Sequence, residues 1–362
     1  MGSRTKTNYF FKHKPLFGLD IGAGSLKVMQ LDADTLGDAS PSIVGYGTTK
    51  FDRSAIENGE IVQPEIIAKA MLEMFKNDLV GDITTRRVAM ALPAYRTFTR
   101  AISLTALKPK ELAEAVQLEA EQYIPMPLED LYLDYSIIKT DKETTEVFAV
   151  AVPRKIVDSY LDLARILGLE AVLVETTLGG CSRLFSLDKQ SAGASVIIDF
   201  GSQSSDISIF DKNILVTGTV QGGGAVFTSS IKNKLNVTQA EANIIKNKYG
   251  LSLSKKQKEI SEALSPTLEQ IVKEVRRMIR YYDERYGADK PVSQVITLGG
   301  GANMPGLADY MTAALRLPVR HSEPWQYLSH KRMQLPSGAD KPMYATAAGL
   351  ALLNPKQVFD RD

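Results

Sequence analysis

Apolar residues recur along this chain with two spacings that alternate with each other. Short apolar runs typical of strands fall at 87–92, 98–104, 131–138 and 147–152. Among them, Pro64–Asp78 and Pro109–Tyr123 repeat apolar residues at helical spacing, each with a proline in its first turn. Strands and helices mixed in this order predict a layered α/β fold.

The second half of the chain contains a longer amphipathic pattern. The spacing predicts a helix from Pro266 to Tyr282 whose apolar stripe faces the core. The polar run at 251–258 reads as a solvated linker before it. A helix at 156–167, ended by Gly168, precedes a short strand at 170–174.

Two stretches, 17–32 and 196–211, resemble each other. Asp20 corresponds to Asp199, and each acid is followed two residues later by a glycine. Each stretch predicts an apolar strand, a tight polar turn that needs glycine, and a second strand. Because the two stretches lie about half the chain apart, we predict a duplicated domain.

Composition narrows the classes of function. The chain has 362 residues, enough for two domains, with 43 basic and 42 acidic side chains. So balanced a charge does not favour nucleic acid as a partner. The one cysteine, Cys181, excludes an internal disulfide and is expected to be buried. No run is apolar enough to predict a membrane span or a signal peptide.

An acidic residue and a glycine at the end of a buried strand suit a phosphate chain. Glycine lets backbone N–H groups approach phosphate oxygens closely, and the carboxylate can hold Mg²⁺ through water. Ser25 and Ser202 add hydroxyl donors, and Lys27 adds a positive charge. One such turn is most often an ordinary β-turn. The prediction therefore depends on two of them facing each other across a cleft.

A third glycine-rich turn extends this pattern. The apolar run at 295–298 leads into Gly299-Gly300-Gly301 and then into a helix predicted to begin at Pro305. Glycines before a helix N-terminus allow close approach of an adenosine or its first phosphate. The order of two acid–glycine hairpins and a triple-glycine turn is that of the actin, Hsp70 and sugar-kinase superfamily.

Several segments resemble the type IV pilus assembly protein PilM family, which is related to the division protein FtsA. They include GLDIGAGSLKVMQL at 18–31, LEAEQYIPMPLEDLYLDY at 118–135, VIIDFGSQSSDISIF at 196–210 and LGGGANMPGLADYM at 298–311. The resemblance extends over nearly the whole chain after residue 16. The EQYIP stretch at 121–125 is its most specific part, because it lies in a subdomain found in FtsA and PilM.

The resemblance implies an actin-like ATPase fold, in which two duplicated RNase H-like domains flank a nucleotide cleft. We expect a flexible N-terminal tail at 1–16, domain I at 17–190 and domain II at 191–362. Domain I would be subdomain 1A interrupted by a small FtsA/PilM-type 1C subdomain at about 86–153. Domain II would be subdomain 2A with a 2B insert at about 226–290.

The resemblance also implies ATP and Mg²⁺ as ligands. The matching positions are Asp20, Gly22, Ser25, Lys27, Asp199, Gly201, Ser202, Gly222, Gly223, Lys246, Gly299, Gly300, Gly301 and Ala302. Asp20 and Asp199 would hold Mg²⁺ through water, with Asp199 the better candidate. Glu175 occupies the place of a water-orienting carboxylate in actin-like ATPases. The alternative role for Glu175 is the N-terminal cap of a helix expected at 176–184.

The segment at 242–250 departs from the family pattern. It resembles an Ala-Glu-x-x-Lys motif whose glutamate and lysine reach the ribose. Lys246 is kept, but Asn243 stands in place of the glutamate, unless a register shift brings Glu241 to the ribose. Both readings are open at this point.

The function implied by the resemblance is that of a cytoplasmic ATP-binding scaffold in the inner-membrane assembly platform of a type IV pilus. Such a scaffold is recruited to the inner face of the cytoplasmic membrane. There it binds the short N-terminal cytoplasmic tail of a PilN-like membrane protein in a groove between 1A and 1C. At most slow ATP hydrolysis is expected, without direct membrane insertion. Contact with the pilus motor ATPase, self-association, and service in a related type II secretion or competence system are left open.

Two alternatives share the same fold. A small-molecule kinase would need an aspartate base in the cleft, for which Asp82, Asp130 and Asp134 are available. An FtsA-like division protein would end in a basic amphipathic helix that lies on the membrane. The stretch 353–362 has a proline, two acids and no apolar face, which argues against that second alternative.

Overall fold

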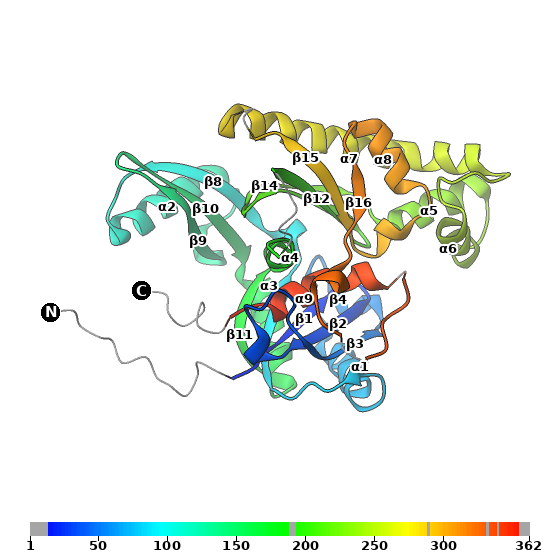
Figure 1. Cartoon of the computed structure of the whole chain (residues 1–362), viewed down its shortest axis with the longest axis horizontal. Helices are drawn as coiled ribbons and strands as arrows, with labels where there is room; N and C mark the ends of the chain where they lie inside the picture. Colours follow the sequence, from blue (N-terminus) through cyan, green and yellow to red (C-terminus); the bar gives the residue numbers. More distant parts are fainter. Residues whose placement is uncertain (1–13, 188–192, 288–289, 331–332, 339, 355–362) are drawn as a thin grey trace.

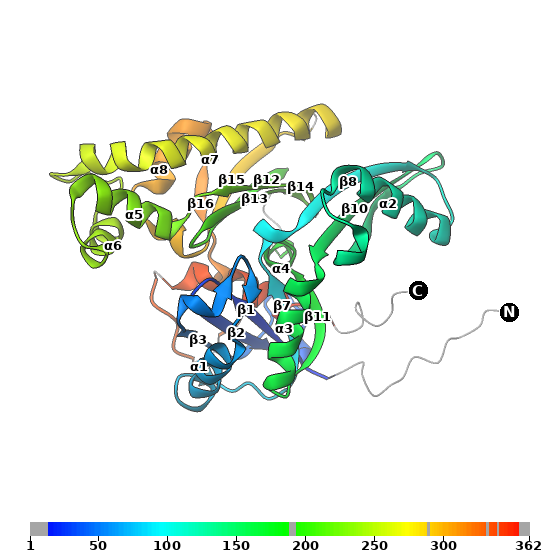
Figure 2. The ribbon, with the colours of Figure 1, turned by 180° about the vertical axis from the view of Figure 1, so that it is seen from behind.

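The computed structural model describes residues 14–187, 193–287, 290–330, 333–338 and 340–354. Two larger sheets lie one above the other, and a smaller sheet projects beside the upper one (Figures 1 and 2). Most of the expected tail at 1–16 lies outside the described residues. Most of the C-terminal stretch 353–362 lies outside them as well. Leu16, however, is buried, and the backbone oxygen of Lys14 accepts a hydrogen bond from Arg87 Nη1 (3.1 Å). Residues 14–16 thus belong to the folded part.

The first sheet, the base of domain I, has strand order β11-β7-β1-β2-β3-β6. Its strands are β1 (Phe17–Ile21), β2 (Ser25–Leu31), β3 (Ile43–Lys50), β6 (Val80–Gly81), β7 (Arg87–Leu92) and β11 (Glu170–Thr176). Helices α1 (Pro64–Asn77) and α3 (Arg154–Ile166) cover one face, while α4 (Thr177–Phe185) and α9 (Ala345–Ala351) pack against the other. Because both faces are covered, every residue of β1 and β7 is buried, which explains their nearly continuous apolar runs.

The second sheet, the base of domain II, has strand order β14-β13-β12-β15-β16. Its strands are β12 (Ala194–Phe200), β13 (Ser204–Asp211), β14 (Asn213–Gln221), β15 (Val292–Leu298) and β16 (Val319–His321). The helices of domain II are α5 (Gly224–Leu235), α6 (Gln239–Lys248), α7 (Gln257–Tyr286) and α8 (Leu307–Leu315). In both sheets an antiparallel hairpin, β1–β2 or β12–β13, pairs through its first strand with a parallel strand, β7 or β15. The two halves therefore share the repeated core that the related stretches predicted.

The small subdomain consists of a three-stranded sheet of order β8-β10-β9 and one helix. Its elements are β8 (Phe98–Thr105), α2 (Pro109–Tyr123), β9 (Leu131–Thr140) and β10 (Thr144–Pro153). The expected limits of 86–153 begin too early, because β7 pairs with β1 and β11 in the first sheet. The small subdomain also contacts domain II. There Glu146 Oε1 accepts hydrogen bonds from Arg285 Nη2 and from the Tyr286 hydroxyl, both at 2.9 Å.

Helix α7 begins at Gln257 rather than at Pro266, where the sequence pattern placed its start. Proline inside a helix loses one backbone hydrogen bond and costs about 3 kcal/mol. Ile260 and Leu264, which precede it, are fully buried, and burying two such side chains contributes about 3–6 kcal/mol. Burial thus outweighs the cost of the proline. The expected linker shrinks accordingly, although Leu253 within it is 93% exposed.

The described end of the chain returns to domain I. We expected domain II to run from 191 to 362, but α9 packs against α4, β1 and β2. The fit is close: a Cβ on Gly18 would lie 2.2 Å from the Ala347 oxygen, and a Cβ on Gly349 would lie 2.0 Å from the Gly180 oxygen. All residues of α9 are buried. The described residues beyond the second sheet therefore complete the first domain.

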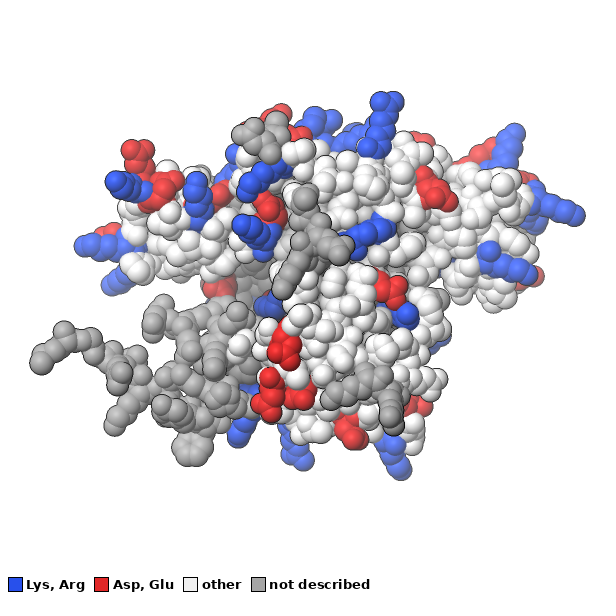
Figure 3. Space-filling view, viewed as in Figure 1, with Lys and Arg blue, Asp and Glu red and all other residues white. Residues whose placement is uncertain are grey.

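The surface carries both signs of charge. Figure 3 shows Lys and Arg interspersed with Asp and Glu over the visible face. This agrees with the near-equal totals of 43 basic and 42 acidic residues. Among the described residues, no helix is long and apolar enough to cross a membrane.

Candidate functional site

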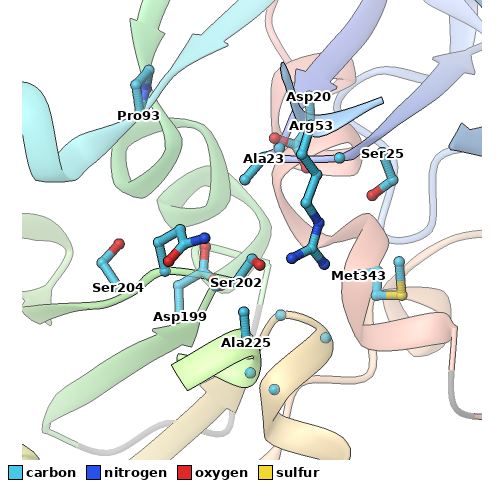
Figure 4. A pocket seen from close by; sticks show the side chains of 18 of the residues that line it. Asp20, Ala23, Ser25, Arg53, Pro93, Asp199, Ser202, Ser204, Ala225 and Met343 are labelled. Atoms are coloured by element: carbon cyan, nitrogen blue, oxygen red, sulfur yellow. The ribbon is translucent and has the colours of Figure 1, made fainter. Parts of the chain in front are cut away.

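A cleft of about 840 Å³ lies between domain I and domain II. Figure 4 shows Asp20, Ser25 and Arg53 on one side of it, with Asp199 and Ser202 on the other. The turns that follow β1, β12 and β15 all line this cleft. Its volume falls within the roughly 300–1,000 Å³ of small-molecule sites.

The structure brings most of the expected site residues together. Those that line the cleft are Asp20, Gly22, Ser25, Lys27, Asp199, Gly201, Ser202, Lys246, Gly299, Gly300 and Gly301. Gly222, Gly223 and Ala302 do not line it, and neither does Glu175. Ala302 is fully buried behind the triple-glycine turn.

The first hairpin places opposite charges side by side. Asp20 on β1 is the register partner of Lys27 on β2, and Lys27 Nζ lies 3.4 Å from Asp20 Oδ2. Both residues are buried. The turn is closed by a hydrogen bond from the Gly22 N–H to the Ser25 oxygen (2.9 Å). Lys27 therefore partly compensates the Asp20 charge at the base of the cleft.

The second hairpin has two acids in the equivalent places. Asp199 on β12 is the register partner of Asp206 on β13. Burial, with the neighbouring charges of Asp206 and Asp20, raises the pKa of Asp199 to about 7, and Lys27 opposes this rise. Burial also raises the pKa of Asp206 to about 6, although hydrogen bonds from Thr219 and Ser204 favour its charged form. This hairpin is therefore short of positive charge near neutral pH.

The triple-glycine turn fits closely against Asp199. Gly299 has φ +80°, and a Cβ there would lie 2.2 Å from Asp199 Oδ1. A Cβ on Gly301 would lie 2.9 Å from Phe200 Cβ, whereas a Cβ on Gly300 would have no atom of the described residues within 4 Å. Gly299 and Gly301 thus allow the packing of this turn, while Gly300 leaves open space.

The start of α5 is tied to the second hairpin turn. The Gly224 N–H donates to the Gly201 oxygen (2.8 Å), and the Ala225 N–H donates to the Ser202 oxygen (2.9 Å). A Cβ on Gly223 would lie 2.4 Å from the Gly201 oxygen. The lack of a side chain on Gly223 therefore allows α5 to begin close to the hairpin turn. Gly223 itself lies behind the cleft wall, and Gly224 lines the cleft.

Helix α6 settles the two readings of the segment at 242–250. Glu241 Oε2 accepts hydrogen bonds from the backbone N–H and the hydroxyl of Thr238, both at 2.8 Å, and so caps the helix. Asn243 and Lys246 line the cleft instead. Lys246 Nζ donates to the Gly224 oxygen (2.9 Å) and to Thr228 Oγ1 (3.0 Å). The register shift that would bring Glu241 to the ribose is therefore wrong.

Glu175 is engaged elsewhere. Both of its carboxylate oxygens bind the guanidinium of Arg183 on α4. The residue that caps α4 is Thr176, whose Oγ1 accepts from the Gly179 N–H (3.0 Å). The alternative that Glu175 caps the helix is therefore wrong, because the cap lies one residue later and Arg183 occupies its carboxylate.

Several cleft residues were not identified from the sequence. Arg53, Lys50 and Thr177 line it from domain I, and Met343 and Thr346 reach it from the C-terminal segment. No local motif marks them, since chain folding alone brings them there. The internal repeat does mark Asp206, which lies in the second hairpin at the place of Lys27 in the first.

The chain matches a known protein family and several solved structures. Residues 18–354 match the family described as Type IV pilus assembly protein PilM. A solved PilM–PilN type IV pilus biogenesis complex matches with a TM-score of 0.80 and 24% identity, covering 94% of this chain and 98% of that one. MreB5 of Spiroplasma citri bound to ADP matches with a TM-score of 0.53 and 13% identity, covering 96% and 99%.

A third solved structure is EutJ, an ethanolamine utilization protein from Carboxydothermus hydrogenoformans. It has a TM-score of 0.55 and 15% identity, covering 94% of this chain and 89% of that one. At these identities the likeness shows the fold alone, which is the actin-like ATPase fold expected from the sequence. The family match extends over nearly the whole chain, and the chain belongs to the type IV pilus assembly protein PilM family.

Proposed function

We propose that this chain is an ATP-binding scaffold of the type IV pilus assembly platform. The observation that carries the proposal is the convergence of two acid–glycine hairpins and a triple-glycine turn on one cleft. The first hairpin comes from domain I, and the other two turns come from domain II. A ligand held by all three would link the two domains.

The residues of the cleft fit a magnesium-bound triphosphate. Lys27 and Lys50 line the cleft and supply positive charge for phosphate oxygens. Asp20 and Asp199 would hold Mg²⁺ through water, and the ion would neutralise phosphate charge. The open space at Gly300 leaves room for the adenosine, with Lys246 and Asn243 beside its ribose.

A scaffold role agrees with the engagement of Glu175. A water-orienting group must reach the attacking water, but the Glu175 carboxylate is held by Arg183 and does not line the cleft. The lining of the cleft also argues against the small-molecule kinase alternative. Asp82, Asp130 and Asp134, its candidate bases, do not line the cleft either.

A short peptide is the proposed partner. A solved PilM–PilN complex matches this chain with a TM-score of 0.80. In this chain a cavity of about 290 Å³ lies where the small subdomain meets domain I and β14. Tyr123 and Phe148 of the small subdomain line it together with Thr176 and Leu178 of domain I. A cavity with aromatic and hydroxyl groups suits the side chains and backbone of a captured peptide.

We place the protein at the inner face of the cytoplasmic membrane through this partner. The peptide would be the N-terminal cytoplasmic tail of a PilN-like membrane protein. Because the tail is anchored, its capture would hold the scaffold at the membrane without a spanning segment of its own.

The peptide part of the proposal is tested by calorimetric titration with the N-terminal peptide of the PilN-like protein. Phe148→Ala should weaken binding by tenfold or more, since truncating a central aromatic contact commonly costs about 2 kcal/mol. Leu118→Ala, on the outer face of α2 where this side chain is 63% exposed, is the matched control. Loss of binding in Leu118→Ala, with Phe148→Ala unaffected, would place the peptide on the outer face and contradict this site.

The nucleotide part is tested by titrating the parent protein with Mg-ATP and with Mg-GTP. Saturable binding of Mg-ATP is expected, and Asp199→Asn should weaken it. A protein that binds neither nucleotide would contradict the proposal.

A further inference from the structure

Arg53 extends into the cleft from domain I. Figure 4 shows its guanidinium in the open middle, between the side that carries Ser25 and the side that carries Ser202 and Ala225. Among the described residues, the structure gives the Arg53 side chain no hydrogen bond and no ion pair, whereas its backbone oxygen accepts from the Ile56 N–H. An arginine turned toward the interior of a cleft without a protein carboxylate is available to an anion that enters it.

The position of Arg53 is fixed by the turn beside it. Its side chain packs on the first glycine turn, where a Cβ on Gly24 would lie 2.9 Å from Arg53 Cγ and 3.1 Å from Nε. The Phe51 N–H donates to the Gly24 oxygen (3.2 Å), which ties the start of the segment to the same turn. The Asp52 carboxylate accepts from the Ser54 N–H (2.9 Å) and closes the short helical turn that carries Arg53. The lack of a Cβ on Gly24 therefore leaves room for the arginine stem.

A second cation reaches the cleft from domain II. Lys246 is 9% exposed and donates two hydrogen bonds to α5, which hold its ammonium group at the cleft wall. Burial and the positive charge of Arg53 lower the pKa of Lys246. Two cations from opposite domains thus repel each other across the cleft, and an anion bound between them would offset this repulsion.

We propose that Arg53 binds a phosphate oxygen of the nucleotide. The nucleotide would then lie between the guanidinium of Arg53 in domain I and the ammonium group of Lys246 in domain II. This inference rests on the proposed ATP site and names a further residue in it. The planar guanidinium can donate two parallel hydrogen bonds to one phosphate from a fixed fork, whereas a lysine ammonium acts as a point charge without this geometry. Affinity would therefore depend on the phosphates of the ligand more than on its base.

The experiment compares Arg53→Met with the parent protein by calorimetric titration of Mg-ATP and of adenosine. Methionine keeps an aliphatic stem to pack on Gly24 and removes the charge. Charge-assisted hydrogen bonds contribute about 1.5–3 kcal/mol, so ATP affinity should fall by about 10- to 100-fold. Adenosine affinity should stay within about twofold, and Arg53→Lys should fall between parent and Arg53→Met.

Lys69→Met on α1 is the control, because it makes the same charge change on an exposed surface of the same domain. It should leave ATP affinity unchanged. If Arg53→Met lost the same affinity for ATP and for adenosine, Arg53 would contact the base or the sugar. If its ATP affinity were unchanged, Arg53 would not contact the nucleotide. Either result overturns the inference and leaves the proposed ATP site intact. A parent protein that binds no nucleotide contradicts the proposed function itself, and this inference with it.

Discussion

Asp199 and Asp206 face each other across the β12–β13 hairpin, in the positions that Asp20 and Lys27 occupy across β1–β2. The duplicated halves thus differ in one charge at the centre of the cleft. In domain I the acid has a lysine partner 3.4 Å away. In domain II two acids share the corresponding site, the half-buried Asp199 and the buried Asp206, so this side of the cleft favours a proton or a cation.

Unfolding should depend on pH through this pair. The folded-state pKa values of Asp199 and Asp206, about 7 and about 6, lie above the ordinary value of 3.8. The folded chain therefore holds protons that the unfolded chain releases. The resulting stabilisation is complete below about pH 4 and is lost progressively as the pH rises from there through the folded pKa values of about 6 and about 7. In the ligand-free protein, the free energy of unfolding by urea should fall by on the order of 2 kcal/mol between pH 5.5 and pH 8.

The variant Asp199→Asn imitates the protonated acid and should flatten this pH profile. Asp38→Asn, on an exposed turn, should keep the slope of the parent. A steep slope in Asp199→Asn equal to that of the parent would show that the pair is not its source.

The glycines of the triple-glycine turn should differ sharply in their tolerance of substitution by alanine. Gly299→Ala places a Cβ 2.2 Å from Asp199 Oδ1 in a backbone conformation with φ +80°. The variant should lose about 1–3 kcal/mol of stability through strain and displacement of the carboxylate. The Cβ of Gly300→Ala would meet no atom of the described residues within 4 Å, so the variant should change the free energy of unfolding by less than about 0.5 kcal/mol. Urea denaturation of the two variants provides the comparison, and similar losses in both would argue against this packing of the turn.

The ion pair of Glu175 and Arg183 should stabilise the folded protein. Their side chains are 18% and 28% exposed, so the ion pair is only partly screened by water. Glu175→Gln and Arg183→Met should each destabilise the protein, and a double-mutant cycle should give a coupling of about 1 kcal/mol. Nucleotide affinity should stay within about twofold in Glu175→Gln. If Glu175→Gln instead abolished a measurable ATP turnover while stability was unchanged, Glu175 would have a catalytic role after all.

The sequence predicted those parts of the structure that local chemistry determines. The two hairpins follow from an acid and a glycine placed after apolar strands, and α1 and α2 follow from their spacing and first-turn prolines. Cys181 is buried, as a lone cysteine in an apolar segment predicts.

The remainder depends on contacts between distant segments. Residues 345–351 are mostly alanine and glycine and give no amphipathic signal, so the sequence does not predict the return of α9 to domain I. Pro266 lies inside α7 because burial of Ile260 and Leu264 outweighs its cost. Arg53 belongs to no motif, and only the packing of its segment on the Gly24 turn brings it to the cleft.

Thermal unfolding with and without Mg-ATP tests the central claim most directly. A ligand at about 1,000 times its dissociation constant stabilises the folded state by about 4 kcal/mol, which should raise the melting temperature by several degrees. The double variant Asp20→Ala with Asp199→Ala should show no rise. A control that removes one exposed acid from each domain, Asp38→Ala with Asp309→Ala, should respond as the parent does. A parent protein whose melting temperature does not change with Mg-ATP would contradict the account.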